Sequence, residues 1–276
     1  MERVALFGAT GAIGGSIAVA LRSQEREYRV VGRLRAELQK NFGSDPRAEI
    51  VTWNPDDPGS VRDAARGVDT IFYLVGVPYW QFELHPILMK KTLDGAIAEG
   101  VQRIVLIGTV YPFGRPQTER VREDHPRQPH TFKGLKRKEQ EDLVLAADAA
   151  GSIHGTILRL PDFYGPNVER SLVAGAFQAA AKGGRAQLVG PIDTPHEFIY
   201  VPDAGPVALA LASEPKAFSA VCTMAAISAG LVMSAGEYAA FTPKSFSIPE
   251  RSFSMAAASP KPLMVTLAPC SASARA

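Results

Sequence analysis

The stretch that decides the fold is Val4-Ala5-Leu6-Phe7-Gly8-Ala9-Thr10-Gly11-Ala12-Ile13-Gly14-Gly15. Its apolar start, residues 4–7, predicts a short strand buried on both faces, and a helix is expected over residues 13–22. Glycines between the two meet three needs: a tight turn, close backbone approach to a pyrophosphate, and close packing of helix on strand. The N–H groups at the helix N-terminus would then bind phosphate oxygens. Because a strand precedes the glycines and a helix follows them, this stretch indicates a dinucleotide site rather than a plain turn.

The first half of the chain continues this alternation of strands and helices. Buried-strand patterns are found at residues 28–31, 50–52, 71–75, 104–107 and 153–160. Helical patterns lie between them at 61–66, 86–99 and 136–150. This order predicts an α/β fold, a Rossmann-type doubly wound parallel sheet with a small C-terminal substrate region.

Composition limits the classes of partner. The chain has 276 residues, 46% of them hydrophobic, and 30 basic against 28 acidic side chains, so no strong field favours nucleic acid. We find no signal peptide and no run of about 18 apolar residues, and we expect a cytoplasmic protein without a membrane partner. Cys222 and Cys270 lack metal-ligand spacing, so no metal site is expected.

The pattern weakens after Pro161. We expect a helix over residues 172–181, a short strand over 198–201, and a helix through Leu211 with Asp203 as its N-cap. From Ala217 onward no helical or strand period is kept. The sequence therefore predicts a dinucleotide-binding domain at 1–165, a partial substrate-binding region at 166–216, and an atypical, irregular tail at 217–276.

The glycine spacing at positions 8, 11 and 14 resembles the extended short-chain dehydrogenases/reductases, which include the NAD-dependent epimerase/dehydratase family. Other segments resemble family motifs in the same order, over about residues 3–215: Asn54 to Pro58, Gly67 to Leu74, Arg103 to Thr109, Arg159 to Pro166, and Glu197 to Asp203. The resemblance implies an NAD(P)-dependent protein acting on a small carbonyl or sugar-like molecule. A homodimer is left open.

The predicted cofactor-binding residues come from four places in the chain. They are Gly8, Thr10, Gly11, Ala12, Ile13 and Gly14 in the loop, Arg33 after the second strand, Asn54 where the family has an aspartate at the adenine, and Leu74, Val75 and Gly76 after the fourth strand.

Arg33 bears on the choice of dinucleotide. Gly32 stands near the position where an NAD enzyme has an acidic residue for the ribose 2′-OH, and Arg33 follows it. A carboxylate would repel a 2′-phosphate, whereas an arginine can bind it with two hydrogen bonds. The sequence therefore favours NADP, with NAD as the alternative and a solvated helix-start residue as the structural interpretation of Arg33.

The acid/base pair of the family is not kept. The resemblance places a tyrosine, followed four residues later by a lysine, on the helix after the fifth strand. Two alignments are open here: Lys133 with Arg137, or Phe132 with Lys136. Neither contains a tyrosine, and an arginine stays charged throughout.

Thr109, Tyr111 and Lys133 are the remaining catalytic candidates. Thr109 keeps the hydroxyl that orients a substrate carbonyl, and Tyr111 is either a displaced phenol or an aromatic of the loop. Lys133 would act as a base only if burial or a cationic neighbour lowered its pKa. His130 is either a loop histidine or a proton carrier.

Three functions are compatible with this pattern. The first is an NADP-dependent, epimerase/dehydratase-like or reductase-like enzyme. The second is an NADP(H)-binding redox sensor, which the missing tyrosine permits. The third is a degraded homologue without stable function, suggested by the tail.

Overall fold

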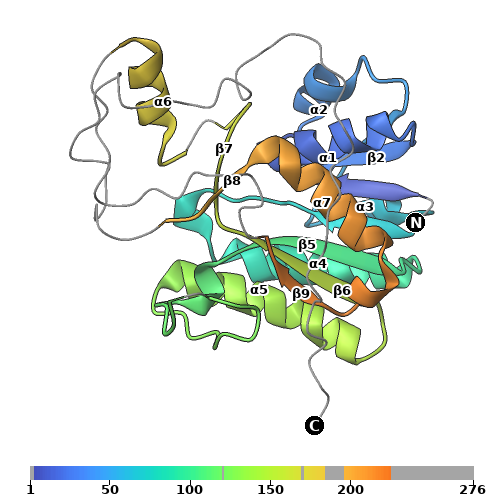
Figure 1. Ribbon diagram of the computed structural model, residues 1–276. Coiled ribbons are helices and arrows are strands. Elements are labelled where there is room, and N and C mark those ends of the chain that lie inside the picture. Colours follow the sequence, from blue (N-terminus) through green and yellow to red (C-terminus); the bar gives the residue numbers. More distant parts are fainter. Residues whose placement is uncertain (1–2, 120, 169–170, 184–195, 225–276) are drawn as a thin grey trace.

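The structure, a computed structural model, describes residues 3–119, 121–168, 171–183 and 196–224 (Figure 1). Its centre is a seven-stranded sheet in the order β3-β2-β1-β4-β5-β6-β9, with every neighbouring pair parallel. The strands are β1 (Val4–Phe7), β2 (Tyr28–Gly32), β3 (Ala48–Thr52), β4 (Thr70–Tyr73), β5 (Arg103–Thr109), β6 (His154–Leu160) and β9 (Val221–Thr223). The predicted doubly wound α/β fold is confirmed.

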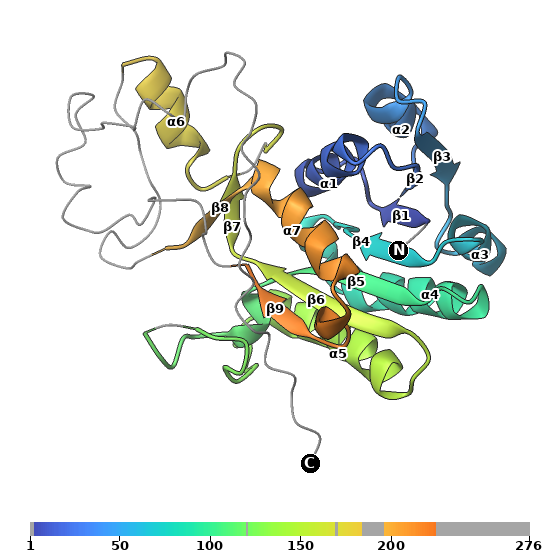
Figure 2. The same cartoon turned by 45° about the vertical axis from the view of Figure 1, so that its right-hand side comes forward.

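Helices cover both faces of this sheet (Figure 2). One face carries α1 (Ala12–Ser23), α2 (Arg35–Phe42) and α7 (Val201–Ser213), and the other carries α3 (Pro58–Ala65), α4 (Leu84–Ala98) and α5 (Phe132–Ala149). In β1, Val4 and Leu6 pack into the first hydrophobic core, whereas Ala5 and Phe7 pack into the second. Side chains of a strand alternate between faces, so a strand buried on both faces is apolar throughout.

The strand order reverses beside β1, which pairs with β2 on one side and β4 on the other. Open α/β sheets bind their ligands at such a point, outside the carboxyl ends of the strands. Beyond this edge lie a two-stranded sheet and a helix (Figure 1). The elements there are η1 (Tyr79–Gln81), η2 (Tyr111–Phe113), β7 (Asp162–Tyr164), α6 (Ala174–Ala181) and β8 (Phe198–Tyr200); η3 (Pro215–Ala217) follows α7.

Three expectations about elements need correction. The helix α2 had no predicted counterpart. Asp203 is not the N-cap of α7, because the helix begins at Val201 with Tyr200 as its cap, which places Asp203 in the first turn. β9 lies in the segment expected to be irregular: three residues are too few to show a period, and pairing with β6 makes them a strand. The rest of the predicted tail, residues 225–276 with Cys270, lies outside the described residues.

In the part of the chain that the structure describes, no helix combines the length and the apolar character that crossing a membrane requires.

The close packing of α1 on α7 depends on Ser16. Pro206 lies inside α7 and has no N–H to donate to the carbonyl of Pro202, four residues earlier. The Ser16 hydroxyl donates to that carbonyl at 3.1 Å and accepts from the backbone N–H of Gly205 at 2.9 Å. A Cβ atom at Gly205 would lie 2.3 Å from the Ser16 carbonyl oxygen, so only glycine allows this approach.

Ser16→Ala should therefore lower the free energy of unfolding by about 1–3 kcal/mol, because it leaves the buried N–H of Gly205 and the partly buried carbonyl of Pro202 without their partner. Urea denaturation measures the change. Ser23→Ala on the same helix is the control, since the exposed Ser23 bonds only the carbonyl of Ala20 and should cost much less. Equal losses for both variants would contradict this account of the interface.

Candidate functional site

The three glycines of the loop after β1 have different structural roles. Gly8 has a φ of 88°, and a Cβ there would lie 2.8 Å from the backbone nitrogen of Val75. A Cβ at Gly14 would lie 2.2 Å from the carbonyl oxygen of Ala9. A Cβ at Gly11 would meet nothing within 4 Å. Gly8 and Gly14 are therefore required by the fold, whereas Gly11 leaves open space for another molecule.

That space belongs to a cavity of 660 Å³ at the carboxyl edge of the sheet. It extends from the loop after β1 to the ends of β5 and β6. Of the predicted site residues, ten line it: Gly8, Gly11, Ala12, Ile13, Gly14, Leu74, Val75, Gly76, Thr109 and Tyr111. The glycine loop and the two hydroxyl-bearing candidates thus share one cavity.

The start of α1 at this cavity fits a phosphate group. Gly11 is the N-cap, no side chain caps the helix, and its first turn carries no acidic residue. The first N–H groups of a helix have no partner within it and carry partial positive charge. Together with the open space at Gly11, this arrangement fits the pyrophosphate of a dinucleotide.

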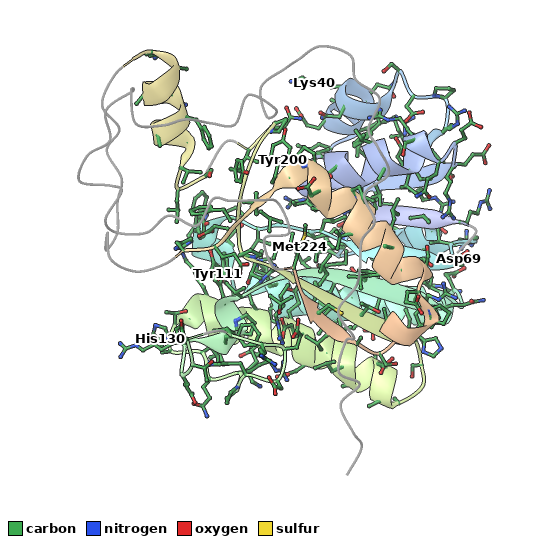
Figure 3. The ribbon with its side chains drawn as sticks, in the orientation of Figure 1. Lys40, Asp69, Tyr111, His130, Tyr200 and Met224 are labelled. Carbon is green, nitrogen blue, oxygen red and sulfur yellow. The ribbon has the colours of Figure 1, made fainter. Side chains whose placement is uncertain are left out.

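Four predicted residues lie outside the cavity lining. Thr10 and Arg33 are exposed, with Arg33 directly after β2. The side-chain oxygen of Asn54 accepts a hydrogen bond from the backbone of Asp56 at 3.0 Å, which closes a local turn. The fourth residue is Lys133. His130 is also outside the lining and exposed, as the loop interpretation predicts, and Figure 3 shows it at the outer edge of the molecule.

Lys133 contacts aromatic rings instead of the cavity. Its ammonium nitrogen lies 3.8 Å from the centre of the Tyr79 ring and 5.7 Å from that of Phe82. Phe132, from the other alignment, is 57% exposed. On α5 it is Arg137, one turn after Lys133, that lines the cavity. Lys133 and Phe132 are thus both outside the lining of the cavity, although the two rings that Lys133 contacts belong to that lining.

Tyr111 lies in the cavity wall, in η2 just after β5 (Figure 3). Its backbone nitrogen donates to the Thr109 hydroxyl at 3.4 Å. Burial, followed by the effects of Tyr79 and Asp162, raises the pKa of Tyr111 to about 12, although Arg137 acts in the opposite direction. The phenol is therefore protonated at neutral pH, and the raised pKa makes it a weaker acid than an ordinary tyrosine.

Gly134 explains how Tyr111 comes to lie against α5. A Cβ at Gly134 would be 2.7 Å from the Tyr111 carbonyl oxygen, so any other residue would push η2 away from the helix. The contact between Gly134 and Tyr111 could not be predicted from the sequence, because the two residues are distant in the chain and meet only in the packed structure.

His85 is a functional candidate that sequence reasoning missed, whereas Arg137 entered the sequence analysis only as the alignment partner of Lys133. The Arg137 guanidinium donates to Gln140 Oε1 at 2.8 Å, to the Ile107 carbonyl at 3.3 Å, and approaches His85 Nδ1 at 3.2 Å. Burial, together with the charge of Arg137, lowers the pKa of His85 to about 3. His85 is therefore neutral at physiological pH and can accept from the guanidinium.

Asp162 and His196 form an ion pair on another part of the cavity wall. His196 Nε2 lies 2.5 Å from Asp162 Oδ2, and this hydrogen bond is the main cause that raises the pKa of His196. The pair joins the start of β7 to the segment just before β8. Within the described ranges, no three His, Cys, Asp or Glu side chains gather in a way that would hold a metal.

Comparisons with known proteins agree with this geometry. The model of the NAD dependent epimerase/dehydratase family matches residues 4–221. A dTDP-6-deoxy-L-talose 4-dehydrogenase (NAD(P)(+)) from Kitasatospora kifunensis is 25% identical over 228 residues, which cover 78% of this chain and 71% of that protein.

Solved structures of two epimerases share the fold. The UDP-N-acetylglucosamine 4-epimerase from Bacillus cereus superposes with a TM-score of 0.69 at 16% identity, covering 82% of this chain and 76% of that one. The UDP-glucose 4-epimerase from Thermotoga maritima superposes with a TM-score of 0.70 at 18% identity, and the match covers 81% of this chain and 76% of that one.

Proposed function

Because the chain belongs to the NAD-dependent epimerase/dehydratase family, we propose that it is an NADP-dependent enzyme acting on a small carbonyl or sugar-like substrate. The observation that carries this proposal is the shared cavity, in which the glycine loop after β1 faces the same space as Thr109 and Tyr111. A bound nicotinamide cofactor would supply or accept the hydride. The sugar-nucleotide enzymes among the structural neighbours support a sugar-modifying role of this kind.

The residues of the cavity would divide the work. The N–H groups at the start of α1 bind the pyrophosphate, and the backbone of residues 74–76 forms the wall beside it. The Thr109 hydroxyl orients the substrate oxygen. Tyr111, whose phenol is protonated, donates the proton to that oxygen when a carbonyl is reduced.

The test is NADPH oxidation by the purified chain against a panel of dTDP-sugars, UDP-sugars and simple carbonyls. Turnover of at least one compound, together with NADPH binding measured by fluorescence, is the expected result. NADPH binding without turnover on any compound would contradict the enzyme and favour a redox sensor. The specific observation behind that second candidate is that neither Phe132 nor Lys133 supplies a tyrosine at the cavity.

Arg33→Glu should shift the preference from NADP towards NAD. Arg33 is exposed directly after β2, the place where a 2′-phosphate would lie, and a carboxylate there repels the phosphate. The measurement is the ratio of the two dissociation constants, and we expect it to change by about tenfold or more. Lys40→Glu, the same charge change in the last turn of α2, should leave the ratio unchanged. An unaltered ratio in Arg33→Glu would count against NADP.

We also propose a homodimer, in which α4 and α5 form the interface. Ile87 on α4 and Phe132 and Leu135 on α5 are 46%, 57% and 44% exposed, and exposed apolar side chains on neighbouring helices mark a contact surface. Light scattering would give the mass of the particle in solution, and Leu135→Glu should yield the monomer.

A cytoplasmic location stays a prediction. The division of the chain into a dinucleotide-binding domain, a substrate-binding region and a tail, with boundaries after residues 165 and 216, also stays a prediction.

A further inference from the structure

A group of ring side chains lines the cavity where the loop after β4 meets α4 and η2. The rings are those of Tyr79 in η1, Phe82, His85 at the start of α4, and Tyr111 in η2. Tyr79 and Phe82 are stacked, with ring centres 5.6 Å apart and planes 6° from parallel, and the Phe82 ring lies 4.8 Å from that of His85. Tyr79 is among the causes that raise the pKa of Tyr111, so these two side chains are also close to each other. One end of the cavity is therefore walled by rings.

Lys133 holds the Tyr79 ring from one side. Its ammonium nitrogen lies 3.8 Å from the centre of that ring and 5.7 Å from the centre of the Phe82 ring, and a cation at such distances is attracted by the π electrons. Because the ammonium and the Phe82 ring are close to each other as well as to Tyr79, neither of them covers the opposite face of the Tyr79 ring. Tyr79 is 50% exposed and lines the cavity, so a molecule bound there can contact the part of the ring that these two partners leave uncovered.

Among the residues that the structure describes, this end of the cavity offers few hydrogen bonds to a ligand. The Phe82 side chain has no polar atom, and His85 Nδ1 already faces an N–H group of Arg137 at 3.2 Å. In the proposed function the phenol of Tyr111 serves the substrate carbonyl, which leaves the phenol of Tyr79. A hydroxyl group that is buried without a partner loses the hydrogen bonds that it made to water. A flat ring without hydroxyl groups therefore fits here better than a polyhydroxylated one.

We propose that Tyr79 is a substrate-binding residue on which an aromatic ring of the substrate stacks, and that Lys133 is the positioning residue that fixes the Tyr79 ring. This inference rests on the proposed function and deepens it, because it names an aryl carbonyl compound as the substrate class. With its ring on Tyr79, such a compound extends its carbonyl group towards Tyr111, the neighbour of Tyr79. Offset-stacked aromatic rings attract each other beyond the apolar area that they bury, whereas a saturated ring is thicker and has no π system.

The test compares acetophenone with cyclohexyl methyl ketone, which has the same carbon skeleton but a saturated ring. Dissociation constants are measured by ligand-observed NMR on the full chain with saturating NADP⁺, and the ratio of the two constants expresses the preference for the aromatic ring. Tyr79→Leu, which keeps an apolar side chain without a ring, should reduce this preference about threefold to tenfold relative to the wild type. Tyr79→Phe, which keeps the ring without the phenol, should retain it. Lys133→Met should weaken it, and Lys133→Arg should restore it.

Trp80→Leu is the matched control, because Trp80 is the next aromatic residue in the chain, is 77% exposed and does not line the cavity. It should leave the ratio of the two constants unchanged, and Tyr79→Met replaces Tyr79→Leu if that protein does not fold. A wild type that binds neither ketone, or a ratio that is the same in the wild type and Tyr79→Leu, overturns the proposal. An unchanged ratio in Lys133→Met overturns the positioning role of Lys133. NADP⁺ affinity and NADPH oxidation in the same samples show separately whether the proposed function itself stands.

Discussion

Gly11→Val is expected to abolish dinucleotide binding while leaving the fold intact. A Cβ atom at Gly11 meets no protein atom within 4 Å, so the larger side chain fits the folded chain and extends into the cavity. There it occupies the space in which the pyrophosphate would approach the backbone. Wild type with NADPH at 100 times its dissociation constant should gain about 2.7 kcal/mol of stability. The variant should gain none, as thermal denaturation with and without NADPH would show.

Two neighbouring glycines provide the controls. Gly15 also has free space around its Cβ position but does not line the cavity, so Gly15→Val should fold and still bind NADPH. Gly14→Val should instead lose at least about 3 kcal/mol of stability, because the new Cβ would lie 2.2 Å from the Ala9 carbonyl oxygen. Normal NADPH binding by Gly11→Val would show that the cavity is not the dinucleotide site.

Tyr111→Phe is expected to lower kcat by about 10²–10⁴-fold with cofactor affinity nearly unchanged. Tyr111 and Tyr79 both line the cavity, and Tyr111 is the one two residues after Thr109, with a backbone hydrogen bond to the Thr109 hydroxyl. Phenylalanine preserves the ring and removes only the hydroxyl. Steady-state kinetics on the best compound of the panel, in the direction of carbonyl reduction, measures the effect.

Tyr164→Phe is the matched control, because Tyr164 stacks on Phe177 outside the cavity lining and its hydroxyl should not affect kcat. Lys133→Met should have a much smaller effect than Tyr111→Phe, since the ammonium contacts the Tyr79 ring. Restoring a tyrosine by Phe132→Tyr should not raise activity, because that position is exposed. Full activity in Tyr111→Phe would show that Tyr111 is not the proton donor. Loss of activity in Lys133→Met, but not in Tyr111→Phe, would show the same.

The sequence by itself determined the parallel sheet and the cofactor end of the site. An apolar strand, a glycine turn and a helix start are local features that a pattern can reveal, although the strand itself pairs with the distant β2 and β4. Gly8, Gly11 and Gly14 were therefore assigned from their spacing. The three-residue strand β9 was missed because only its pairing with β6 defines it.

Only the tertiary structure determined which side chains line the part of the cavity next to α5 and η2. Lys133 and Arg137 lie four residues apart on one helix, and spacing could not tell which of them reaches the cavity. Packing against Tyr79 removes Lys133 from it, and the contact of Gly134 with η2 places Tyr111 beside α5. Two of the three partners of Arg137, His85 on α4 and the Ile107 carbonyl of β5, lie 52 and 30 residues away in the sequence. The burial and the electrostatic environment of a side chain depend on such neighbours in space, and the order of residues along the chain does not show which residues become neighbours.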